Sequence, residues 1–219
     1  MLDLVEILNS EYPKENITKP VLNRVSPTRI IGCPRGGFFS AFGFREPLSA
    51  RSEQNFSFGT KAHERIQEIL DRKGIAVEVE KKFFYNDPPM MGFVDAIIKD
   101  GYQKYVLEIK TTSKKIESLH EPMQTHIDQI MLYLHVTGIK KGIILYETKF
   151  PKHDTFWKFF SVDYDADKAR KVLHRGRRLM EDIKEFKIPL PEKGCMCSNP
   201  ACYDKTLQRK AKTIWKESQ

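Results

Sequence analysis

Long hydrophobic runs are absent from this chain of 219 residues, and no apolar stretch approaches the roughly 18 to 20 residues that span a membrane. The first sixteen residues, MLDLVEILNSEYPKEN, also lack the basic start and the small-residue cleavage site of a secretory signal. We therefore expect a cytoplasmic protein, in a prokaryote or in the host of a virus, with no membrane partner. Apolar residues still make up 40% of the chain, which is enough to bury a core, and the length favours a single domain, 1–219.

Cysteine is scarce as well, with four residues in the chain. In a reducing compartment so few cysteines are poor candidates for disulfides and better ones for metal ligands or buried apolar residues. Cys195, Cys197 and Cys202 fall within eight residues of a Pro-, Asn- and Lys-rich tail, where core packing explains such crowding poorly. A metal ion or cluster is the better explanation there. Cys33, taken alone, fits a small core residue.

Negative charge is in deficit. The 37 Lys and Arg residues outnumber 29 Asp and Glu, which gives a net charge of +8 and indicates a polyanionic partner, with nucleic acid as the first candidate. Residues 165–186 form a predicted helix with a basic centre, KARKVLHRGRR, and a second basic segment follows at 205–216. A solvated helix face explains the first of these as well as a track for phosphates does.

The stretch 92–112, GFVDAIIKDGYQKYVLEIKTT, places acidic and basic residues on two apolar strands. Asp100-Gly101 predicts a two-residue turn, which pairs Lys99 with Tyr102 and makes this stretch an antiparallel hairpin. In that register Asp95, Glu108 and Lys110 share one face, and the two carboxylates stand in a diagonal relation of about 7 to 8 Å. Burying these charges unpaired costs several kcal/mol each, so we expect a divalent cation beside them. Oxygen ligands suit Mg²⁺ or Mn²⁺, which would bind a phosphate oxygen and activate water with the help of Lys110.

Two further helices carry candidate side chains. The amphipathic helix predicted over 58–73 ends at Gly74 and contains His63, which is either a metal ligand or a hydrogen-bonded helix residue. The helix predicted over 123–136 carries Gln129 and Tyr133 four residues apart on one face, where they could align a nucleic acid or pack as a satisfied pair. Strands at 75–84, 142–148 and 155–162 complete a mixed sheet flanked by helices, while Gly36-Gly37 and residues 45–55 are predicted as loops. A short helix is predicted over 2–12.

Together these motifs resemble the RecB-like exonucleases of the PD-(D/E)XK superfamily, especially the CRISPR-associated and viral RecB-type enzymes with an iron-sulfur cluster. The likeness runs from about residue 26 to residue 202 and consists of SPTRIIGCP, GTKAH, GFVD, the E-x-K strand and the Q-x-x-x-Y helix. It implies an α/β fold with a restriction-endonuclease-like core at 56–165, and cluster-binding segments at 26–44 and 187–219 that a metal cluster joins.

The same resemblance implies the roles of the individual residues. His63, Asp95, Glu108 and the backbone carbonyl of Ile109 would bind manganese or magnesium, with Lys110 assisting catalysis and with Gln129 and Tyr133 guiding a single strand of DNA. A [4Fe-4S] cluster would be held by Cys33, Cys195, Cys197 and Cys202. The spacing C-x-C-x-x-x-x-C departs from the family pattern, so a four-cysteine zinc site is the second candidate.

The expected function is metal-dependent exonucleolytic hydrolysis of DNA, with single-stranded ends preferred. CRISPR adaptation, in complex with other proteins, and phage or cellular recombination and repair are both compatible with the sequence. The alternative is a non-catalytic nucleic-acid-binding module stabilised by a four-cysteine metal site. The acidic pair with Lys110 favours the enzyme, because a pure binder gains nothing from carboxylates that face a phosphate without a cation.

Overall fold

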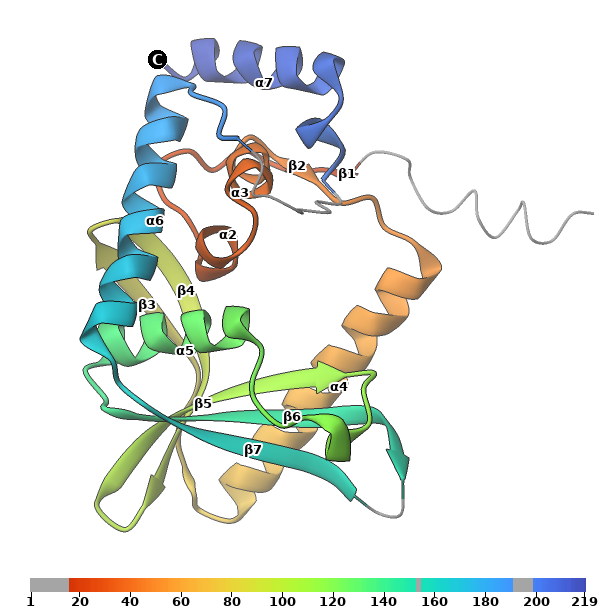
Figure 1. Cartoon of the computed structure of the whole chain (residues 1–219), viewed down its shortest axis with the longest axis vertical. Coiled ribbons are helices and arrows are strands. Elements are labelled where there is room, and N and C mark those ends of the chain that lie inside the picture. The colour runs from red at the N-terminus through yellow and green to blue at the C-terminus, as the bar shows by residue number, and fades with distance from the viewer. Residues whose placement is uncertain (1–15, 153–154, 191–198) are drawn as a thin grey trace, which may run out of the picture. The chain divides into compact units, whose positions relative to one another are not determined.

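The computed structural model describes residues 16–152, 155–190 and 199–219. Two compact units are present (Figure 1). One comprises residues 55–85 and 91–172, and the other comprises the chain before residue 55, residues 86–90 and the chain from residue 173 onward. None of the helices within the described ranges is both long enough and apolar enough to cross a membrane.

A five-stranded sheet forms the centre of the first unit. Its strands are β3 (Ala76–Asn86), β4 (Pro89–Asp100), β5 (Gln103–Thr112), β6 (Lys141–Lys152) and β7 (Thr155–Asp163), which lie side by side in that order. β4 pairs antiparallel with β5 and β6 pairs antiparallel with β7, whereas β5 and β6 are parallel. The parallel pair needs a crossover, which the short helix η1 (Ile116–Ser118) and α5 (Gln124–Thr137) provide. The prediction of a mixed sheet is therefore confirmed.

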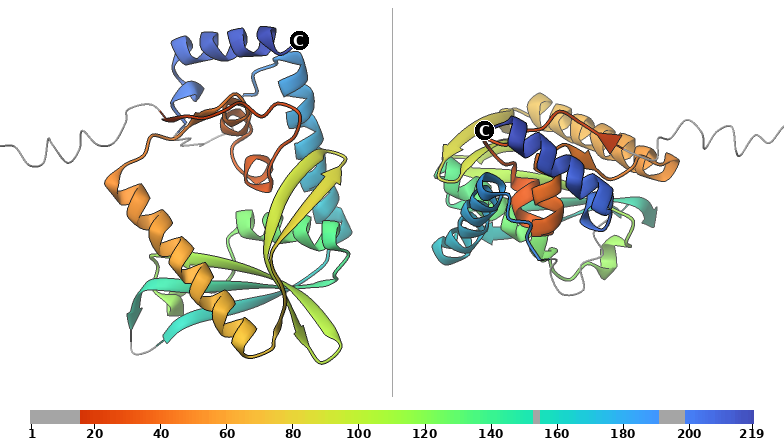
Figure 2. Two further views of the ribbon diagram at one scale, coloured as in Figure 1. Left: turned by 180° about the vertical axis from the view of Figure 1, so that it is seen from behind. Right: turned by 90° about the horizontal axis from the view of Figure 1, so that it is seen from above.

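Helices cover both faces of this sheet. α4 (Ala50–Arg72) and α5 lie on opposite sides, as the front view and the view from behind show (Figures 1 and 2). On the α4 side, Ile66 packs against Ala96, Leu107 and Ile109. On the α5 side the packing is so close that a side chain at Gly142 would meet Ile130 Cδ1 at 2.6 Å. The strands between them are consequently buried on both faces.

The β4–β5 hairpin differs from its prediction by a shift in register. Asp100 pairs with Gln103, so the turn residues are Gly101 and Tyr102 instead of Asp100 and Gly101. Gly101 has a positive φ of 56°, which suits glycine at the first central position of the tight turn. The shift moves the pairing by two residues, and an even shift keeps every side chain on its predicted face.

Helix boundaries account for two wrong loop predictions. Gly36 and Gly37 lie inside α3 (Pro34–Ala41). Position 37 requires glycine, because a Cβ there would lie 2.5 Å from the carbonyl oxygen of Arg29. The predicted loop at 45–55 ends at residue 49, because α4 begins eight residues before the predicted Phe58. α5 and α6 (Ala166–Glu185) match their predicted ranges to within one residue at each end.

The second unit contains the small sheet of β1 (Asn16–Ile17) and β2 (Phe44–Arg45), with α2 (Pro27–Ile31), α3, the short helix η2 (Pro200–Cys202) and α7 (Lys205–Glu217). An aromatic cluster forms part of its core. The Phe186 ring lies 5.5 Å from that of Phe38, 5.4 Å from that of Phe42 and 5.6 Å from that of Trp215. Trp215 also donates a hydrogen bond to the carbonyl oxygen of Lys184 at 3.0 Å, which anchors α7 on the end of α6. The helix predicted over residues 2–12 lies outside the described residues.

Candidate metal centre

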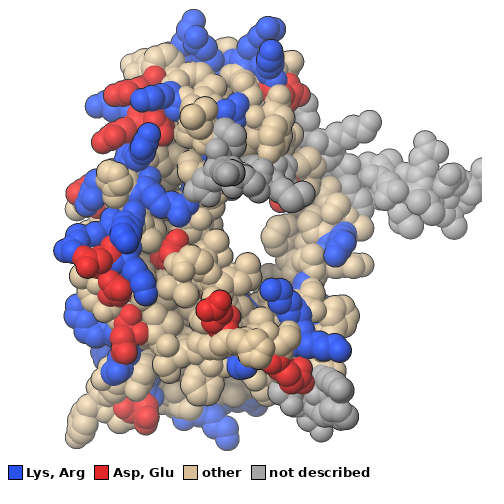
Figure 3. All heavy atoms as spheres, viewed as in Figure 1, with Lys and Arg blue, Asp and Glu red and all other residues tan. Residues whose placement is uncertain are grey.

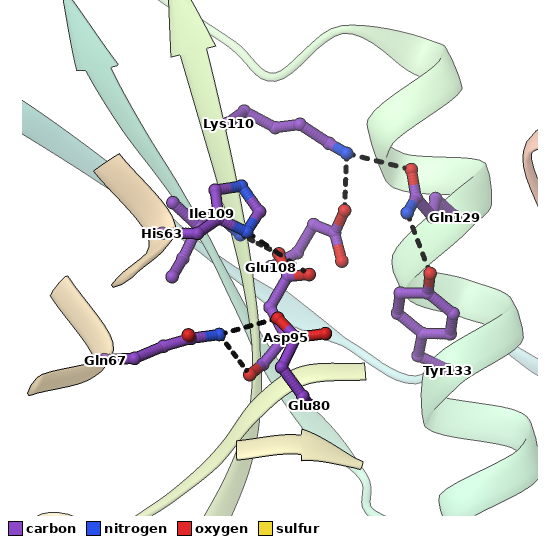
Figure 4. A network of polar contacts seen from close by, with 9 residues as sticks. All are labelled: His63, Gln67, Glu80, Asp95, Glu108, Ile109, Lys110, Gln129 and Tyr133. Carbon is purple, nitrogen blue, oxygen red and sulfur yellow. Dashed lines mark hydrogen bonds and ion pairs between the residues drawn. The ribbon is translucent and has the colours of Figure 1, made fainter. Parts of the chain in front are cut away.

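Asp95 on β4 is fixed by the neighbouring strand. The described register of β4 and β5 ends at the pair Ala96 and Leu107, one position before Asp95. There the backbone N–H of Ile109 donates to Asp95 Oδ2 at 2.7 Å (Figure 4), and Gln67 of α4 donates to the Asp95 carbonyl oxygen at 2.9 Å. The Asp95 carboxylate therefore accepts a hydrogen bond that, in a regular pair of strands, a backbone carbonyl would accept. This bond fixes the position of the carboxylate relative to β5.

Glu108 is the most deeply buried acidic residue of the site, with 1% of its surface exposed. Its Oε1 forms an ion pair with Lys110 Nζ at 2.5 Å, but its Oε2 accepts no hydrogen bond from any residue that the structure describes. Burial raises the pKa of Glu108 to about 8, and the negative charge of Asp95 adds to this effect while Lys110 opposes it. A buried carboxylate oxygen without a donor is costly unless a cation is beside it.

Lys110 connects this carboxylate to α5. Its Nζ donates to Gln129 Oε1 at 3.0 Å, and Gln129 Nε2 donates to the hydroxyl of Tyr133 at 2.9 Å. Gln129 and Tyr133 are only 6% and 4% exposed, and the Tyr133 ring meets Phe83 edge to face at 5.7 Å. The two residues share a helix face as predicted, but the partner that the structure gives Gln129 is Lys110. A ring buried in this way has no open face for a base to stack on, and the guidance of DNA by Tyr133 stays a prediction.

His63 and Glu80, two possible metal ligands, lie close to Asp95. Possible ligand atoms of His63, Glu80 and Asp95 all lie within 4.8 Å of one another, and the Nδ1 of His63 is 3.7 Å from Asp95 Oδ1. His63 comes from α4, whereas Gln129 and Tyr133 approach from α5 on the other side of the strand (Figure 4). The structure thus brings together all the residues that the sequence predicted for metal binding, catalysis and DNA guidance. They are linked by side-chain contacts and by adjacency along β5, and they are His63, Asp95, Glu108, Ile109, Lys110, Gln129 and Tyr133.

Glu80 is a member of this group that the sequence analysis missed. Its φ of 46° lies in the left-handed region, which a non-glycine residue in a strand rarely adopts. Gln67 donates to Glu80 Oε1 at 2.9 Å as well as to the Asp95 carbonyl, so it joins the two acidic residues. A signal for this was present in the sequence, because the alternation of AVEVE breaks at the run Glu80-Lys81-Lys82. Such a break is typical of an irregularity that turns a side chain.

The electrostatics of these residues suit a divalent cation. Burial raises the pKa of Asp95, although His63, the Ile109 N–H and Lys110 all favour the charged form. The buried Glu108, the half-buried Asp95, the exposed Glu80 and the imidazole of His63 form a mixed O and N donor set that Mg²⁺ or Mn²⁺ accepts. The buried Glu108 Oε2, which has no hydrogen-bond donor within the described part of the chain, leaves a place for such an ion, so the residues present fit it. An ion bound here would supply positive charge to a phosphate oxygen and acidify a water molecule.

The predicted cluster ligands are described only in part. Cys33 is the N-cap of α3 and Cys202 ends η2, while Cys195 and Cys197 lie outside the described residues. The segment that carries Cys202 packs on α3, because Arg35 donates to the Cys202 carbonyl oxygen at 2.9 Å. Asn199 donates to the carbonyl oxygens of Phe44 at 2.8 Å and Gly36 at 3.5 Å. Two segments that are far apart in sequence, each with a predicted cluster cysteine, therefore meet in one unit.

Basic side chains of α6 have protein partners. Arg175 donates to the carbonyl oxygens of Ile31 and Gly32, and Arg177 donates to Asp87 at 2.8 Å. Lys and Arg side chains are interspersed with acidic ones along the edge where α6 runs, and others stand out on α7 (Figure 3). Part of the basic centre of α6 thus has a structural role, which limits how much of it can form a phosphate track.

Comparison with known proteins finds likeness in structure. No family model matches the chain, and no curated protein is significantly similar to it in sequence. Among solved structures, the crystal structure of SSO0001 matches with a TM-score of 0.58 and 21% identity over 85% of this chain and 88% of that chain. An alkaline exonuclease, LHK-Exo from Laribacter hongkongensis, matches with a TM-score of 0.57 and 14% identity over 88% and 95% of the respective chains.

A phage-related exonuclease from Haemophilus somnus also matches, with a TM-score of 0.50 and 12% identity over 78% of this chain and 96% of its own. The chain has a restriction-endonuclease-like fold. These matches and the mixed sheet between helices confirm the fold class predicted from the sequence. Because identity is below 25% in each case, the likeness concerns the fold.

Proposed function

We propose that this protein is a metal-dependent DNA exonuclease of the PD-(D/E)XK type, which hydrolyses phosphodiester bonds at single-stranded ends. The observation that carries the proposal is the buried Glu108 beside Asp95. One of its oxygens pairs with Lys110, and the other has no donor among the residues that the structure describes. Stability does not explain this arrangement, because replacing a buried ion pair by apolar residues of similar size is often neutral or stabilising. Hydrolysis of a phosphodiester needs it, because the reaction develops negative charge on a phosphate.

Each residue has a role in this proposal. His63, Asp95, Glu108 and the carbonyl of Ile109 hold a manganese or magnesium ion, and Glu80 is close enough to His63 and Asp95 to take part. Lys110 orients the attacking water or stabilises the charge that develops on the phosphate. Gln129 and Tyr133 are positioning residues, because Gln129 accepts a hydrogen bond from Lys110 and Tyr133 fixes the amide of Gln129.

The structural neighbours support the DNA substrate. Two of them are described as exonucleases, and the alkaline exonuclease has also been solved in complex with dAMP, a match with a TM-score of 0.56. The excess of Lys and Arg over acidic residues agrees with a polyanionic substrate. The biological setting we propose is CRISPR adaptation or phage or cellular recombination, in complex with other proteins.

We also propose that Cys33, Cys195, Cys197 and Cys202 hold one [4Fe-4S] cluster, with zinc as the second candidate. The packing of the Cys202 segment on the helix that begins at Cys33 supports this, since a shared cluster requires the two to be near each other. Its role would be structural, because it would join the ends of the chain.

Digestion of end-labelled single-stranded and duplex DNA, with manganese and with EDTA, tests the hydrolytic proposal. With manganese, we expect the DNA to be shortened progressively from an end, and faster when it is single-stranded. With EDTA, we expect no shortening. Glu108→Ala and Lys110→Ala should bind DNA without cutting it. Comparable cleavage by folded Glu108→Ala would reject the site, and DNA binding without hydrolysis by the unmodified protein would favour the alternative of a non-catalytic binding module.

A further inference from the structure

The candidate metal ligands His63, Glu80 and Asp95, called the metal group below, lie at one end of a groove on the first unit. The groove has a volume of about 590 Å³, and its lining includes Asn55, Phe56, Gly59, Thr60, His63, Glu80 and Thr111. Phe56, Thr60, His63 and Gln67 are spaced at i, i+4, i+7 and i+11 along α4, so one stripe of the helix lines the groove from its outer end to the metal group. The groove is thus continuous with the candidate active site.

Charge changes along this groove. The metal end is acidic, with Glu64, Glu80 and Asp95 near His63. At the outer end Lys149 of β6 donates a hydrogen bond to Asn55, which lines the groove, and its Nζ stands 5.4 Å over the ring of Phe58. These two contacts hold a positive charge beside the outer end of the groove.

Phe56 is an exposed aromatic residue in this groove, with 64% of its surface accessible. It lies seven residues before His63 on α4, a rise of about 10 Å, which corresponds to about three stacked nucleotides. Exposure alone does not set Phe56 apart, since Phe84, Phe150 and Phe159 are about as exposed, but Phe56 lines the groove that contains His63 and Glu80. An exposed ring at that place can stack on the flat face of an unstacked base. Tyr133, the aromatic residue expected from the sequence to guide a single strand, is only 4% exposed, whereas the Phe56 ring is accessible.

Gly59 keeps the groove open. It stands one turn before His63, and a Cβ at this position would have Thr111 Oγ1 at 3.9 Å as its nearest neighbour, an ordinary contact distance. A larger side chain is therefore compatible with the helix, yet it would extend into the space between Phe56 and the metal group. The hydroxyls of Thr60 and Thr111 remain available along the same wall for phosphate or sugar oxygens.

We propose that this groove is a binding track for single-stranded DNA, in which a base stacks on Phe56 about three nucleotides from the reacting phosphate and Lys149 neutralises the phosphate beside it. The track deepens the proposed nuclease function and rests on it, because its inner end is the metal group. It also gives a reason for a preference for single strands, since a base within a duplex has no free face to offer to the ring.

Binding of a fluorescein-labelled 12-nucleotide oligothymidylate, followed by anisotropy in Ca²⁺ with the label checked for cleavage, tests the track. We expect Phe56→Ala to raise the Kd by about 5- to 150-fold, the range that corresponds to 1 to 3 kcal/mol for one stacked base. Phe159→Ala is the matched control, because Phe159 is also 64% exposed but does not line the groove, and its Kd should change less than twofold. With an oligonucleotide of abasic sites, which has phosphates but nothing to stack, Phe56→Ala and the unmodified protein should bind alike.

Hydrolysis of bis(p-nitrophenyl) phosphate in Mn²⁺ separates the track from the chemistry. This small diester cannot span the groove, so its hydrolysis by Phe56→Ala should stay within twofold of that by the unmodified protein. Cleavage of DNA by the same variant, at DNA concentrations below the Kd, should fall in proportion to the rise in Kd. Equal effects of Phe56→Ala and Phe159→Ala on DNA binding, or a loss that persists with abasic DNA, would overturn the track and leave the nuclease proposal standing. Absence of hydrolysis of both DNA and the small diester by the unmodified protein would instead overturn the proposed function.

Discussion

The backbone N–H of Ile109 donates to Oδ2 of Asp95 at 2.7 Å, so the carboxylate on β4 is held by the residue between Glu108 and Lys110. This contact fixes the position of Asp95 relative to β5, the strand that carries Glu108. A site whose ligands are already in place loses less conformational freedom when a ligand arrives.

Removal of the Glu108 charge should abolish both cleavage and stabilisation by metal. We expect Glu108→Gln to lower the rate of DNA hydrolysis by at least about 10²- to 10³-fold, the loss typical of one group that stabilises charge in a transition state. At an Mn²⁺ concentration of 100 times the Kd, the unmodified protein should gain about 2.7 kcal/mol, or about 5 to 10 °C in Tm, and the variant clearly less.

Thermal melting with and without Mn²⁺ measures the second effect. Glu78→Gln is the control, because Glu78 is an exposed glutamate of β3 that pairs with Lys81. An equal rise in Tm for both variants would show that Glu108 does not take part in metal binding.

Loss of the Tyr133 hydroxyl should affect turnover through Lys110. Tyr133→Phe removes the acceptor for the amide of Gln129, which in turn loses its fixed orientation toward Lys110. We expect kcat to fall by roughly 5-fold, the equivalent of one hydrogen bond of about 1 kcal/mol, with KM for DNA within twofold of its normal value. Steady-state kinetics on a labelled single strand gives both constants. An unchanged kcat with a raised KM would instead support direct contact between Tyr133 and DNA.

Acid should destabilise the protein through His126. The ring accepts or donates a hydrogen bond with the Tyr146 hydroxyl at 2.6 Å, and burial together with the nearby charge of Lys110 lowers the pKa of His126 to about 4. In the unfolded chain His126 binds a proton near pH 6.5, whereas in the folded protein it binds one only near pH 4. The free energy of unfolding is therefore at its full value above pH 6.5 and falls as the pH drops from 6.5 to 4.

Urea denaturation at a series of pH values between 7 and 4 tests this dependence. His126→Gln cannot take up the proton, and its free energy of unfolding should fall less steeply with acidification than that of the unmodified protein. His120→Gln is the control, since His120 is exposed and should keep the normal slope. Parallel slopes for all three proteins would contradict the role of His126.

The cysteines should bind iron and stabilise the second unit. Anaerobically purified protein should be brown with about four irons per chain, and Cys33→Ser or Cys202→Ser should lose the colour. Closing a loop of more than a hundred residues is worth roughly 5 kcal/mol by analogy with a disulfide, so each variant should also melt at a lower temperature. Metal analysis and thermal melting give the two results. Stoichiometric zinc without iron would replace the cluster by a zinc site, and an unchanged Tm for Cys33→Ser would remove the structural role.

Local periodicity predicted much of the arrangement of the candidate site. The side-chain period of two places Glu108 and Lys110 on one face of β5, and this holds even though the hairpin turn was predicted one residue too early. The period of the helix places Gln129 and Tyr133 together in the same way. These relations depend on residues close in sequence, so the backbone geometry alone is enough to predict them.

Tertiary packing decided what those side chains meet. Gln129 and Tyr133 lie on the buried face of α5, where Gln129 meets Lys110 and Tyr133 meets Gln129. No local pattern distinguishes this buried face from a face open to DNA. Glu80 joins His63 and Asp95 only because its backbone adopts a positive φ, and Phe56 lines the same groove only because α4 begins at Ala50 and continues past it. The sequence alone thus determined the strand and helix faces, through short-range periodicity, whereas contacts between residues tens of positions apart depended on how the helices pack on the sheet.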